Sequence, residues 1–317
     1  MGGWNKVKIL IIGTPRAPTL SVGSNGLGRH VYDFLRLFSS QDCEITTLLH
    51  PLSKLEWGNV KQLHFTDEID TTHEVRKLIS MEKYDVILDN THFKMLSRDY
   101  HKDNLPIVNF IHDEECPYVP PNCLLGNLHQ KQKYTTGKVF KTGVIFDNYS
   151  LYEEKEDYFC FAGKLEHRKG FDIALEVANR TGIEIKFAGP DLMGIGNSLP
   201  NWVGEIKDSE EFSDFVGRSQ GLFYPSRSDA GGMGIWEAAA LGTPTITTSA
   251  SGARCNVIHG KTGYIGNSIE ELCKSVNEIR ELSPKNVREE ARQVWDLSEN
   301  FKKIYKLLQE VSEGARW

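Results

Sequence analysis

The stretch that decides the fold is PSRSDAGGMGIWEAAALGTP, residues 225–244. It places a glycine-rich loop directly before an apolar helix, which the following Gly-Thr-Pro is expected to end at Leu241. Backbone N–H groups and the positive end of the helix dipole then face one point, an arrangement that binds anions, most often phosphate. Asp229 lies in the loop, and Glu237 is expected in the first turn or so of the helix. Because carboxylates repel phosphate but accept hydrogen bonds from hydroxyls, the stretch predicts a site for a phosphate attached to sugars.

A second group of charged residues follows an earlier strand, in FAGKLEHRKGFDIAL, residues 161–175. Gly163 ends that strand, and Lys164, Arg168 and Lys169 come before the next helix. In a doubly wound sheet such a strand-to-helix turn lies at the carboxyl edge, where ligands bind. Two or three cations there would neutralise a diphosphate, whereas a solvated basic turn is the alternative interpretation. The glycine-rich loop further along the same half favours the diphosphate site.

Composition and charge argue against several classes of function. The chain has 317 residues, enough for two domains, and its formal net charge of −6 argues against a nucleic-acid partner. No apolar run approaches the length of a membrane span, and the opening MGGWNKVKILIIG lacks the pattern of a secretory signal. The six cysteines have no CxxC spacing, which is typical of free thiols in a reducing compartment. We therefore expect a cytoplasmic protein.

Hydrophobic patterning predicts two parallel-sheet halves. Short apolar runs without polar alternation, typical of buried parallel strands, alternate with helical stripes. The first half is expected to have strands at 7–12, 44–49, 85–88 and 107–111 and helices around 31–38 and 75–79. The second half is expected to have strands at 158–163, 183–189, 221–225 and 245–247 and further helices at 171–178, 209–216 and 269–280. This alternation indicates an α/β sheet with helices on both faces in each half.

The chain is expected to divide into two domains near residue 147. The alternation of strands and helices stops over residues 131–150 and restarts at Tyr158, after a polar, charged junction. We therefore expect one domain at 1–147 and a second at 148–297. A last helix, within 298–317, has an apolar stripe that must be buried on another part of the molecule: Phe301, Ile304, Tyr305 and Leu308.

These motifs resemble the C-terminal half of the retaining glycosyltransferases of family 4, which have the two-domain GT-B fold. That family shows a Gly-Arg pair, a Lys-Gly a few residues later, and then a Glu-x7-Glu motif. Here Lys164 stands in place of the Arg, and Lys169 matches the Lys. Asp229 and Glu237 match the acidic pair, with Asp in place of the first Glu. The resemblance implies two Rossmann-like, doubly wound domains facing each other across a cleft, with the last helix packed back on the N-terminal domain.

The resemblance also implies roles toward a nucleotide-sugar donor. Lys164 and Lys169 would hold the diphosphate, Asp229 would hold the donor sugar, and Glu237 would hold the nucleotide ribose. The positions that would surround the donor beside them are Gly163, Arg168, Ala230, Gly231, Gly232 and Met233. Because Asp229 is one methylene shorter than the family's Glu, we expect it to decide which sugar fits.

The first half carries a matching loop, GSNGLGRHVYDFL, residues 23–35. It resembles the family's N-terminal glycine-rich loop, in which Gly26 and Gly28 would let the backbone approach the ligand. A dinucleotide fingerprint is the weaker alternative, because the order here is G-x-x-G-x-G and lies well after the strand. His112 ends a buried strand and would face the donor sugar, with Asp113 next to it, although a packed strand-end histidine is the other interpretation.

The implied reaction moves a hexose, with retention, from a nucleoside-diphosphate sugar to a hydroxyl acceptor, with UDP-glucose as the default donor. No Asp-x-Asp tripeptide occurs, so the usual metal handle for a diphosphate is missing, and we expect no metal and no further cofactor. A phosphorylase or epimerase on this fold, and a non-catalytic nucleotide-sugar-binding subunit, are the alternatives. A basic stretch is expected to be a solvated linker, or else to contact an anionic acceptor or a membrane surface: Lys131, Lys133, Lys138 and Lys141.

Overall fold

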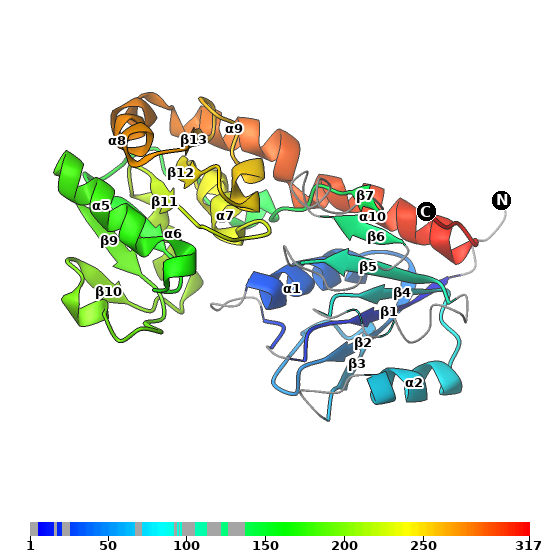
Figure 1. The fold of residues 1–317 in the computed structure, drawn as a ribbon. Helices are drawn as coiled ribbons and strands as arrows, with labels where there is room; N and C mark the ends of the chain where they lie inside the picture. The colour runs from blue at the N-terminus through cyan, green and yellow to red at the C-terminus, as the bar shows by residue number, and fades with distance from the viewer. Residues whose placement is uncertain are drawn as a thin grey trace.

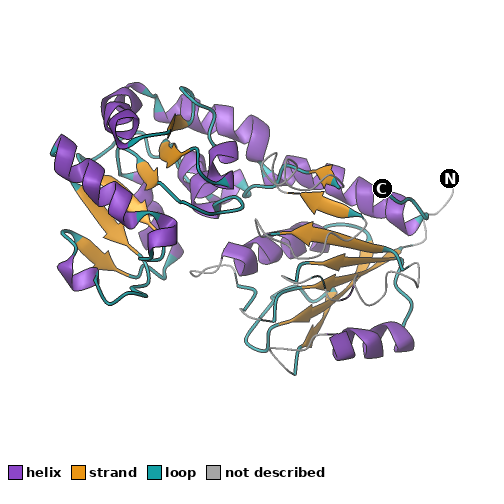
Figure 2. Ribbon diagram, in the orientation of Figure 1, coloured by secondary structure: helices purple, strands orange, loops and turns teal. Residues whose placement is uncertain are grey.

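The protein consists of two α/β domains that lie side by side, each built on a parallel sheet (Figure 1). This computed structural model describes residues 6–15, 18–20, 26–66, 72–91, 94, 96, 105–112, 122–125 and 137–317. Helices pack on both sheets, and two long helices near the C-terminus run from the second domain back to the first (Figure 2).

The N-terminal sheet has seven described strands in the order β3-β2-β1-β4-β5-β6-β7. They are β1 (Val7–Ile12), β2 (Cys43–Leu49), β3 (Val60–His64), β4 (Val86–Asp89), β5 (Ile107–Ile111), β6 (Cys123–Leu125) and β7 (Lys138–Val139). Alternate residues of β1 enter two different apolar cores, because successive side chains of a strand point to opposite faces. Ile9 and Ile11 share a core with α1 (Gly26–Ser39), whereas Leu10 and Ile12 share one with α2 (Thr72–Met81).

The C-terminal sheet has six described strands in the order β10-β9-β8-β11-β12-β13. They are β8 (Phe159–Ala162), β9 (Ile185–Ala188), β10 (Trp202–Gly204), β11 (Leu222–Tyr224), β12 (Thr245–Thr248) and β13 (Gly263–Gly266). Its helices are α5 (Phe171–Thr181), α6 (Ser209–Gly217), α7 (Met233–Ala240), α8 (Ile269–Glu278) and α9 (Pro284–Trp295).

In both parallel sheets the order of the strands reverses beside the first strand of the domain. In the N-terminal sheet this point lies between β1 and β4, and in the C-terminal sheet it lies between β8 and β11. In open α/β sheets, ligands bind outside the carboxyl ends of the strands at such a reversal. In the C-terminal domain the segments that follow these strand ends are residues 163–170 and 225–232. The topology therefore brings together the two sequence motifs that carry charge and glycine.

Helix α10 (Leu297–Ser312) packs on the N-terminal domain, although it follows the C-terminal one. Phe301, Ile304 and Leu308 are buried in the core that holds α1, and the rings of Phe301 and Phe38 meet edge to face at 4.7 Å. The segment that leads back to the N-terminal domain lies beside the segment that leaves it. There the Leu297 N–H donates to the Val144 carbonyl at 2.9 Å. The apolar stripe of the last helix is thus buried against the first domain.

The strands and helices expected from the patterning are present, within a few residues of their expected ends. The elements that patterning did not indicate are short or glycine-rich: β3, β6, β7, β10 and β13. Helix α9 was missed too, because it is mainly polar, and only Val287, Ala291 and Trp295 are buried. The point near residue 147 at which the domains were expected to divide falls in a 3-10 turn, Phe146–Asn148, and its exact place stays a prediction.

Candidate functional site

A cavity of about 590 Å³ lies between the two domains, and residues of both line it. The N-terminal domain contributes the start of α1 and the end of β5, and the C-terminal domain contributes the loops after β8 and β11. Among the residues that the structure describes, every position expected around the donor except one lines this cavity: Gly26, His112, Gly163, Lys164, Arg168, Lys169, Asp229, Ala230, Gly231, Gly232, Met233 and Glu237. The exception is Gly28, where a Cβ would lie 2.2 Å from the Pro18 carbonyl oxygen, so this glycine serves the packing of α1.

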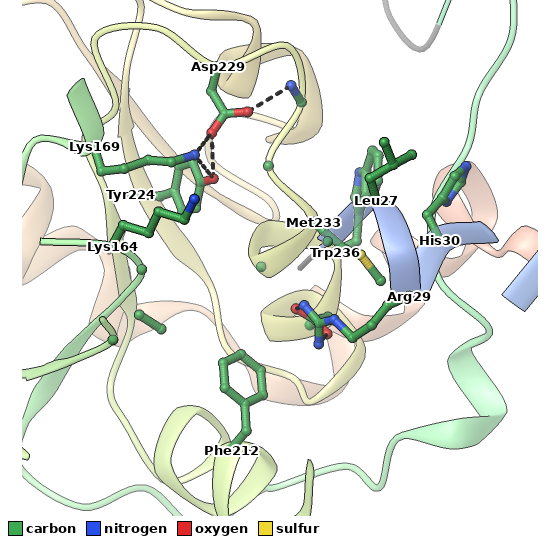
Figure 3. Close-up of a pocket in the computed structure, with 18 of the residues that line it drawn as sticks. Leu27, Arg29, His30, Lys164, Lys169, Phe212, Tyr224, Asp229, Met233 and Trp236 are labelled. Carbon is green, nitrogen blue, oxygen red and sulfur yellow. Dashed lines mark hydrogen bonds and ion pairs between the residues drawn. The ribbon is translucent and has the colours of Figure 1, made fainter. Parts of the chain in front are cut away.

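Lys169 and Asp229 form an ion pair on one wall of the cavity (Figure 3). The Tyr224 hydroxyl donates to the same Asp229 oxygen at 2.7 Å, and the Gly231 N–H donates to the other at 3.3 Å. Burial would raise the pKa of Asp229, but the Lys169 ammonium and these hydrogen bonds lower it below its usual value. Burial also raises the pKa of Tyr224 well above its usual value, so this phenol stays protonated. These contacts hold Lys169, Asp229 and Tyr224 together as one polar cluster, in which Lys169 is the cation.

A close backbone contact and a side chain hold the loop that carries Lys169 in place. Gly170 has a φ of +78°, and a Cβ there would lie 2.1 Å from the Pro225 carbonyl oxygen. The loop after β8 therefore packs closely on the loop after β11. Arg168 joins the same two loops, because its guanidinium donates to the Ser228 carbonyl at 3.1 Å and to Glu166 at 2.8 Å. Lys164 is exposed and lines the cavity beside them.

The glycine-rich turn ends at Gly232, the residue before α7. Its φ is +95°, a conformation that favours glycine, and a Cβ would also meet the Tyr224 ring at 2.9 Å. The Asn256 amide donates to the Gly231 carbonyl at 2.8 Å and supports the turn from behind. Since the first N–H groups of a helix have no partner within it, the start of α7 offers donors and a positive dipole end to the cavity.

Glu237 is engaged differently from what the sequence implied. It lies in the second turn of α7, and its carboxylate forms a two-pronged ion pair with Arg29 of α1, with Nη2 to Oε2 at 3.1 Å. The Tyr149 hydroxyl donates to Oε1 at 3.2 Å, and Glu237 is 1% exposed. Asp33, one turn along α1, has its pKa raised to about 7 by burial and by the Glu237 charge. This buried polar group joins the two domains directly.

His112 stands at the end of β5 and faces the cavity from the N-terminal domain. Its ring stacks on Phe110 at 4.8 Å, and its Nε2 lies 3.2 Å from the Asn90 side-chain oxygen. Behind it lies His30, whose pKa burial lowers to about 3, so this second histidine is neutral. The Asp113 position lies outside the described residues.

Sequence reasoning missed several residues that line the cavity. Arg29 and His30 directly follow the first glycine-rich loop, and this GRH sequence was the signal available for them. Phe212 of α6 gave no signal, and in the close-up it lies at the opposite end from Asp229 (Figure 3). The cavity therefore extends from the Lys169–Asp229 pair to Phe212.

The basic stretch between the halves is described only in part. Lys131 and Lys133 lie outside the described residues, Lys141 is exposed, and the Lys138 ammonium lies 4.2 Å from the centre of the Trp317 ring. Among the residues that the structure describes, no cluster of three or more acidic, histidine or cysteine side chains is suited to hold a metal ion. No helix in the same part of the chain combines the length and apolarity that a membrane span needs.

Comparison with known proteins gives one family match and many similar folds. Residues 195–294 match the family model described as Glycosyl transferases group 1. No protein among the curated sequences matches the chain. AviGT4, a glycosyltransferase involved in avilamycin A biosynthesis, is 18% identical, with a TM-score of 0.77 over 98% of this chain and 100% of its own.

Two further solved structures resemble the chain over nearly its whole length. Sucrose-phosphate synthase from Thermosynechococcus elongatus is 13% identical, with a TM-score of 0.78 over 98% of this chain and 100% of its own. HepE from Anabaena, in complex with UDP and glucose, is 14% identical, with a TM-score of 0.70 over 96% of this chain and 99% of its own. The expected fold class, two Rossmann-like domains of the GT-B type, is therefore confirmed.

Proposed function

We propose that this chain, which has the GT-B fold and matches the Glycosyl transferases group 1 family over residues 195–294, is a glycosyltransferase that moves a hexose from a nucleoside-diphosphate sugar to a hydroxyl acceptor with retention of configuration. The observation that carries the proposal is the wall formed by Lys169, Asp229 and Tyr224 beside the start of α7. It combines a fixed cation, a helix N-terminus and a partly buried carboxylate within one cavity between two domains. The cation and the helix N-terminus suit a diphosphate, and the carboxylate suits the hydroxyls of the attached sugar.

The chemistry follows from where charge develops. The bond between the anomeric carbon and the diphosphate oxygen breaks, and a bond forms from that carbon to the acceptor oxygen. The acceptor's proton moves to the leaving diphosphate, on the same face as the attack. Negative charge grows on that diphosphate, so fixed positive groups stabilise the transition state more than the ground state. Lys164, Lys169 and the first N–H groups of α7 supply them in this proposal.

Asp229 is assigned to the donor sugar and His112 to the same sugar from the opposite domain. Lys169 and Tyr224 contact one oxygen of Asp229 and so fix the orientation of its carboxylate. A carboxylate in a fixed orientation accepts hydrogen bonds only from sugar hydroxyls that lie in matching positions. The nucleoside would then extend toward Phe212, at the far end of the cavity in Figure 3. UDP is our first choice of nucleotide, because the HepE structure contains UDP and glucose.

A thermal-shift panel of UDP-, GDP- and ADP-sugars tests the donor, because a ligand that binds the folded state raises its melting temperature by mass action. The best donor is then incubated with the protein, and release of the nucleoside diphosphate is measured with and without EDTA. We expect slow release without any acceptor, and equal rates with EDTA. Stabilisation by a donor without release on a broad set of acceptors would favour the non-catalytic subunit. Dependence on inorganic phosphate would favour a phosphorylase, and interconversion of the donor sugar an epimerase.

We also propose a cytoplasmic location. Cys43 and Cys160 are buried free thiols, as is common where thiols stay reduced. Fractionation of cells that express the full chain, with detection in the cytosolic fraction, is the expected result, whereas secretion would contradict it.

A further inference from the structure

We propose that Asn90 is a positioning residue for the transfer reaction, because it fixes the orientation and the tautomer of His112. The inference rests on the proposed function, in which His112 contacts the donor sugar. It gives a role to a residue that the sequence motifs did not indicate and that does not itself line the cavity.

The side chains of Asn90 and His112 are in direct contact. Asn90 follows the last residue of β4 and His112 follows the last residue of β5, and these two strands are neighbours in the sheet. The His112 Nε2 lies 3.2 Å from the Asn90 Oδ1. Because a carboxamide oxygen only accepts hydrogen bonds, the Nε2 carries the proton. The other ring nitrogen, Nδ1, is then the acceptor of the neutral ring.

Asn90 is itself held in a fixed turn. Its side chain is 2% exposed, and its backbone N–H donates to the Ile12 carbonyl at 2.9 Å. The buried Lys94 ammonium donates to the carbonyls on either side of it, to that of Asp89 at 3.2 Å and to that of Thr91. The Asp89 carboxylate accepts from the Thr91 N–H at 2.8 Å and closes the turn. The amide therefore keeps one place at the end of the strand.

The other neighbours of the His112 ring hold it without adding a charge. Phe110 stacks on the ring at 4.8 Å, and the His30 ring meets it edge to face at 5.8 Å. Burial lowers the pKa of His30 to about 3, so His30 is neutral. Of the cations on the adjacent segments, Arg29 forms the ion pair between the domains and Lys94 binds the two carbonyls. The neutral partners, unlike a carboxylate, do not favour the doubly protonated ring.

The consequence for the reaction is the direction of a hydrogen bond. A ring whose acceptor nitrogen has a fixed place accepts a hydrogen bond from a sugar hydroxyl, whereas the other tautomer or the cation would donate there instead. A ring that is held in one tautomer before the donor binds does not have to be reorganised during transfer. Asn90 thus acts through His112 and does not touch the sugar.

Nitrogen NMR of protein with isotope-labelled histidine reads the tautomer directly and needs no donor. The signals of His112 are identified by their loss in His112→Gln. We expect the wild type at near-neutral pH to show one tautomer, with the proton on Nε2, and Asn90→Ala to show a mixture of both. A proton on Nδ1 in the wild type, or an unchanged tautomer in Asn90→Ala, would overturn the inference.

Donor turnover tests whether the contact matters for transfer. Asn90→Ala should lower kcat/KM roughly five- to tenfold, as loss of one hydrogen bond does. In a His112→Ala background the same change should lower it by less than about twofold, because Asn90 acts only through His112. Asn59→Ala is the matched control, since its amide donates to the Ser39 carbonyl at 2.7 Å and does not line the cavity. It should keep the wild-type kcat/KM, and equal losses from Asn90→Ala in both backgrounds would count against the inference.

Asn90→Asp is the second variant, and it is used also if Asn90→Ala does not fold. Its carboxylate still accepts from the His112 Nε2, so the tautomer should be kept, but its negative charge favours the cationic ring. The acid limb of the pH profile of kcat/KM should therefore move to higher pH by about one unit or more. A side chain that only filled space would leave this limb at its wild-type position, and that result would overturn the positioning role.

Lack of turnover with any UDP-, GDP- or ADP-sugar would contradict the proposed function. The NMR measurement would still decide whether Asn90 sets the tautomer of His112. Normal turnover together with a tautomer that ignores Asn90 would count against this inference alone.

Discussion

Lys169 and Asp229, which lie in two different loops of the C-terminal sheet, form an ion pair that the Tyr224 hydroxyl bridges. Their side chains are 18% and 14% exposed, so the pair faces the cavity while most of it is shielded from water. Ion pairs in such a setting are screened less by salt than surface pairs. The cation and the acid are thus oriented before any ligand binds.

Tyr224→Phe tests this orientation. The change removes one hydroxyl that donates to Asp229 and lies 3.3 Å from the Lys169 ammonium. A hydrogen bond to a charged group contributes about 1.5–3 kcal/mol, so we expect kcat/KM for donor turnover to fall roughly ten- to a hundredfold. Tyr264→Phe, on β13 and outside the cavity lining, is the control and should keep wild-type kcat/KM. Equal kcat/KM in both variants would show that the hydroxyl does not orient the pair.

Gly170→Ala and Gly182→Ala form a matched pair of substitutions at left-handed positions. Both glycines have positive φ, +78° and +73°, which costs an alanine about 1–2 kcal/mol. At Gly182 nothing lies within 4 Å of the added Cβ, whereas at Gly170 the Pro225 carbonyl oxygen lies 2.1 Å away. We expect Gly170→Ala to lose clearly more free energy of unfolding, and to lose donor turnover because Lys169 moves. Urea denaturation compares them, and equal losses would contradict this.

His30 should make stability depend on pH. Its folded-state pKa of about 3 lies below the usual 6.5, so between these values the unfolded chain binds a proton that the folded chain does not. The stabilisation is complete above pH 6.5 and falls as the pH drops toward 3, by at most about 1.4 kcal/mol per pH unit. Between pH 7 and pH 5, the free energy of unfolding of His30→Gln should therefore fall by roughly 1–2 kcal/mol less than that of the wild type.

Urea denaturation at both pH values checks this difference. His73→Gln, at an exposed position of α2, is the control and should follow the wild type. Asp33 acts in the opposite direction, because its raised pKa, about 7, makes the folded state bind a proton that the unfolded chain releases above its usual pKa of 3.8. The stabilisation that Asp33 contributes is lost as the pH rises through 7. Because this partly offsets the effect of His30 in the wild type, the His30→Gln variant must be measured beside it. An identical pH dependence in His30→Gln and the wild type would contradict the account of His30.

Phe301→Ala tests how firmly α10 holds the N-terminal domain. The ring is 3% exposed and packs on Phe34, Phe38 and Tyr305. Removing a buried aromatic ring of this kind costs about 3–5 kcal/mol of unfolding free energy. Lys302→Ala, at the next and exposed position, should change it by less than about 0.5 kcal/mol. A loss below about 1 kcal/mol in Phe301→Ala would mean that α10 is not part of the first core.

Local patterns were enough to predict the sheets and one wall of the cavity. Buried parallel strands such as VKILII are recognisable as apolar runs, and the turn at Gly232 needs a residue that tolerates positive φ. The edge strand Trp202–Gly204 is too short to have a period. Gly28 was expected to face the ligand, but the absence of a side chain at this position allows the backbone to pack closely against Pro18.

The contact between domains could not be predicted in the same way. Arg29 and Glu237 are 208 positions apart, and neither has a neighbour in sequence that indicates its partner. Charge alone suggested that Glu237 faced hydroxyls, because the sequence of α7 says nothing about which side chain of α1 approaches it. Such pairs depend on how the domains meet, and that is set by the packing of α10 and the connecting segment.

The measurement that tests the central claim most directly is nucleoside-diphosphate release from the donor that the panel selects, in the wild type and in Lys169→Ala. Loss of a fixed positive group at the leaving diphosphate is expected to reduce release at least about a hundredfold. Lys261→Ala, whose surface lysine pairs with Glu290, should retain the wild-type rate. Release by Lys169→Ala at the wild-type rate would contradict the assignment of this cavity to a nucleotide-sugar donor.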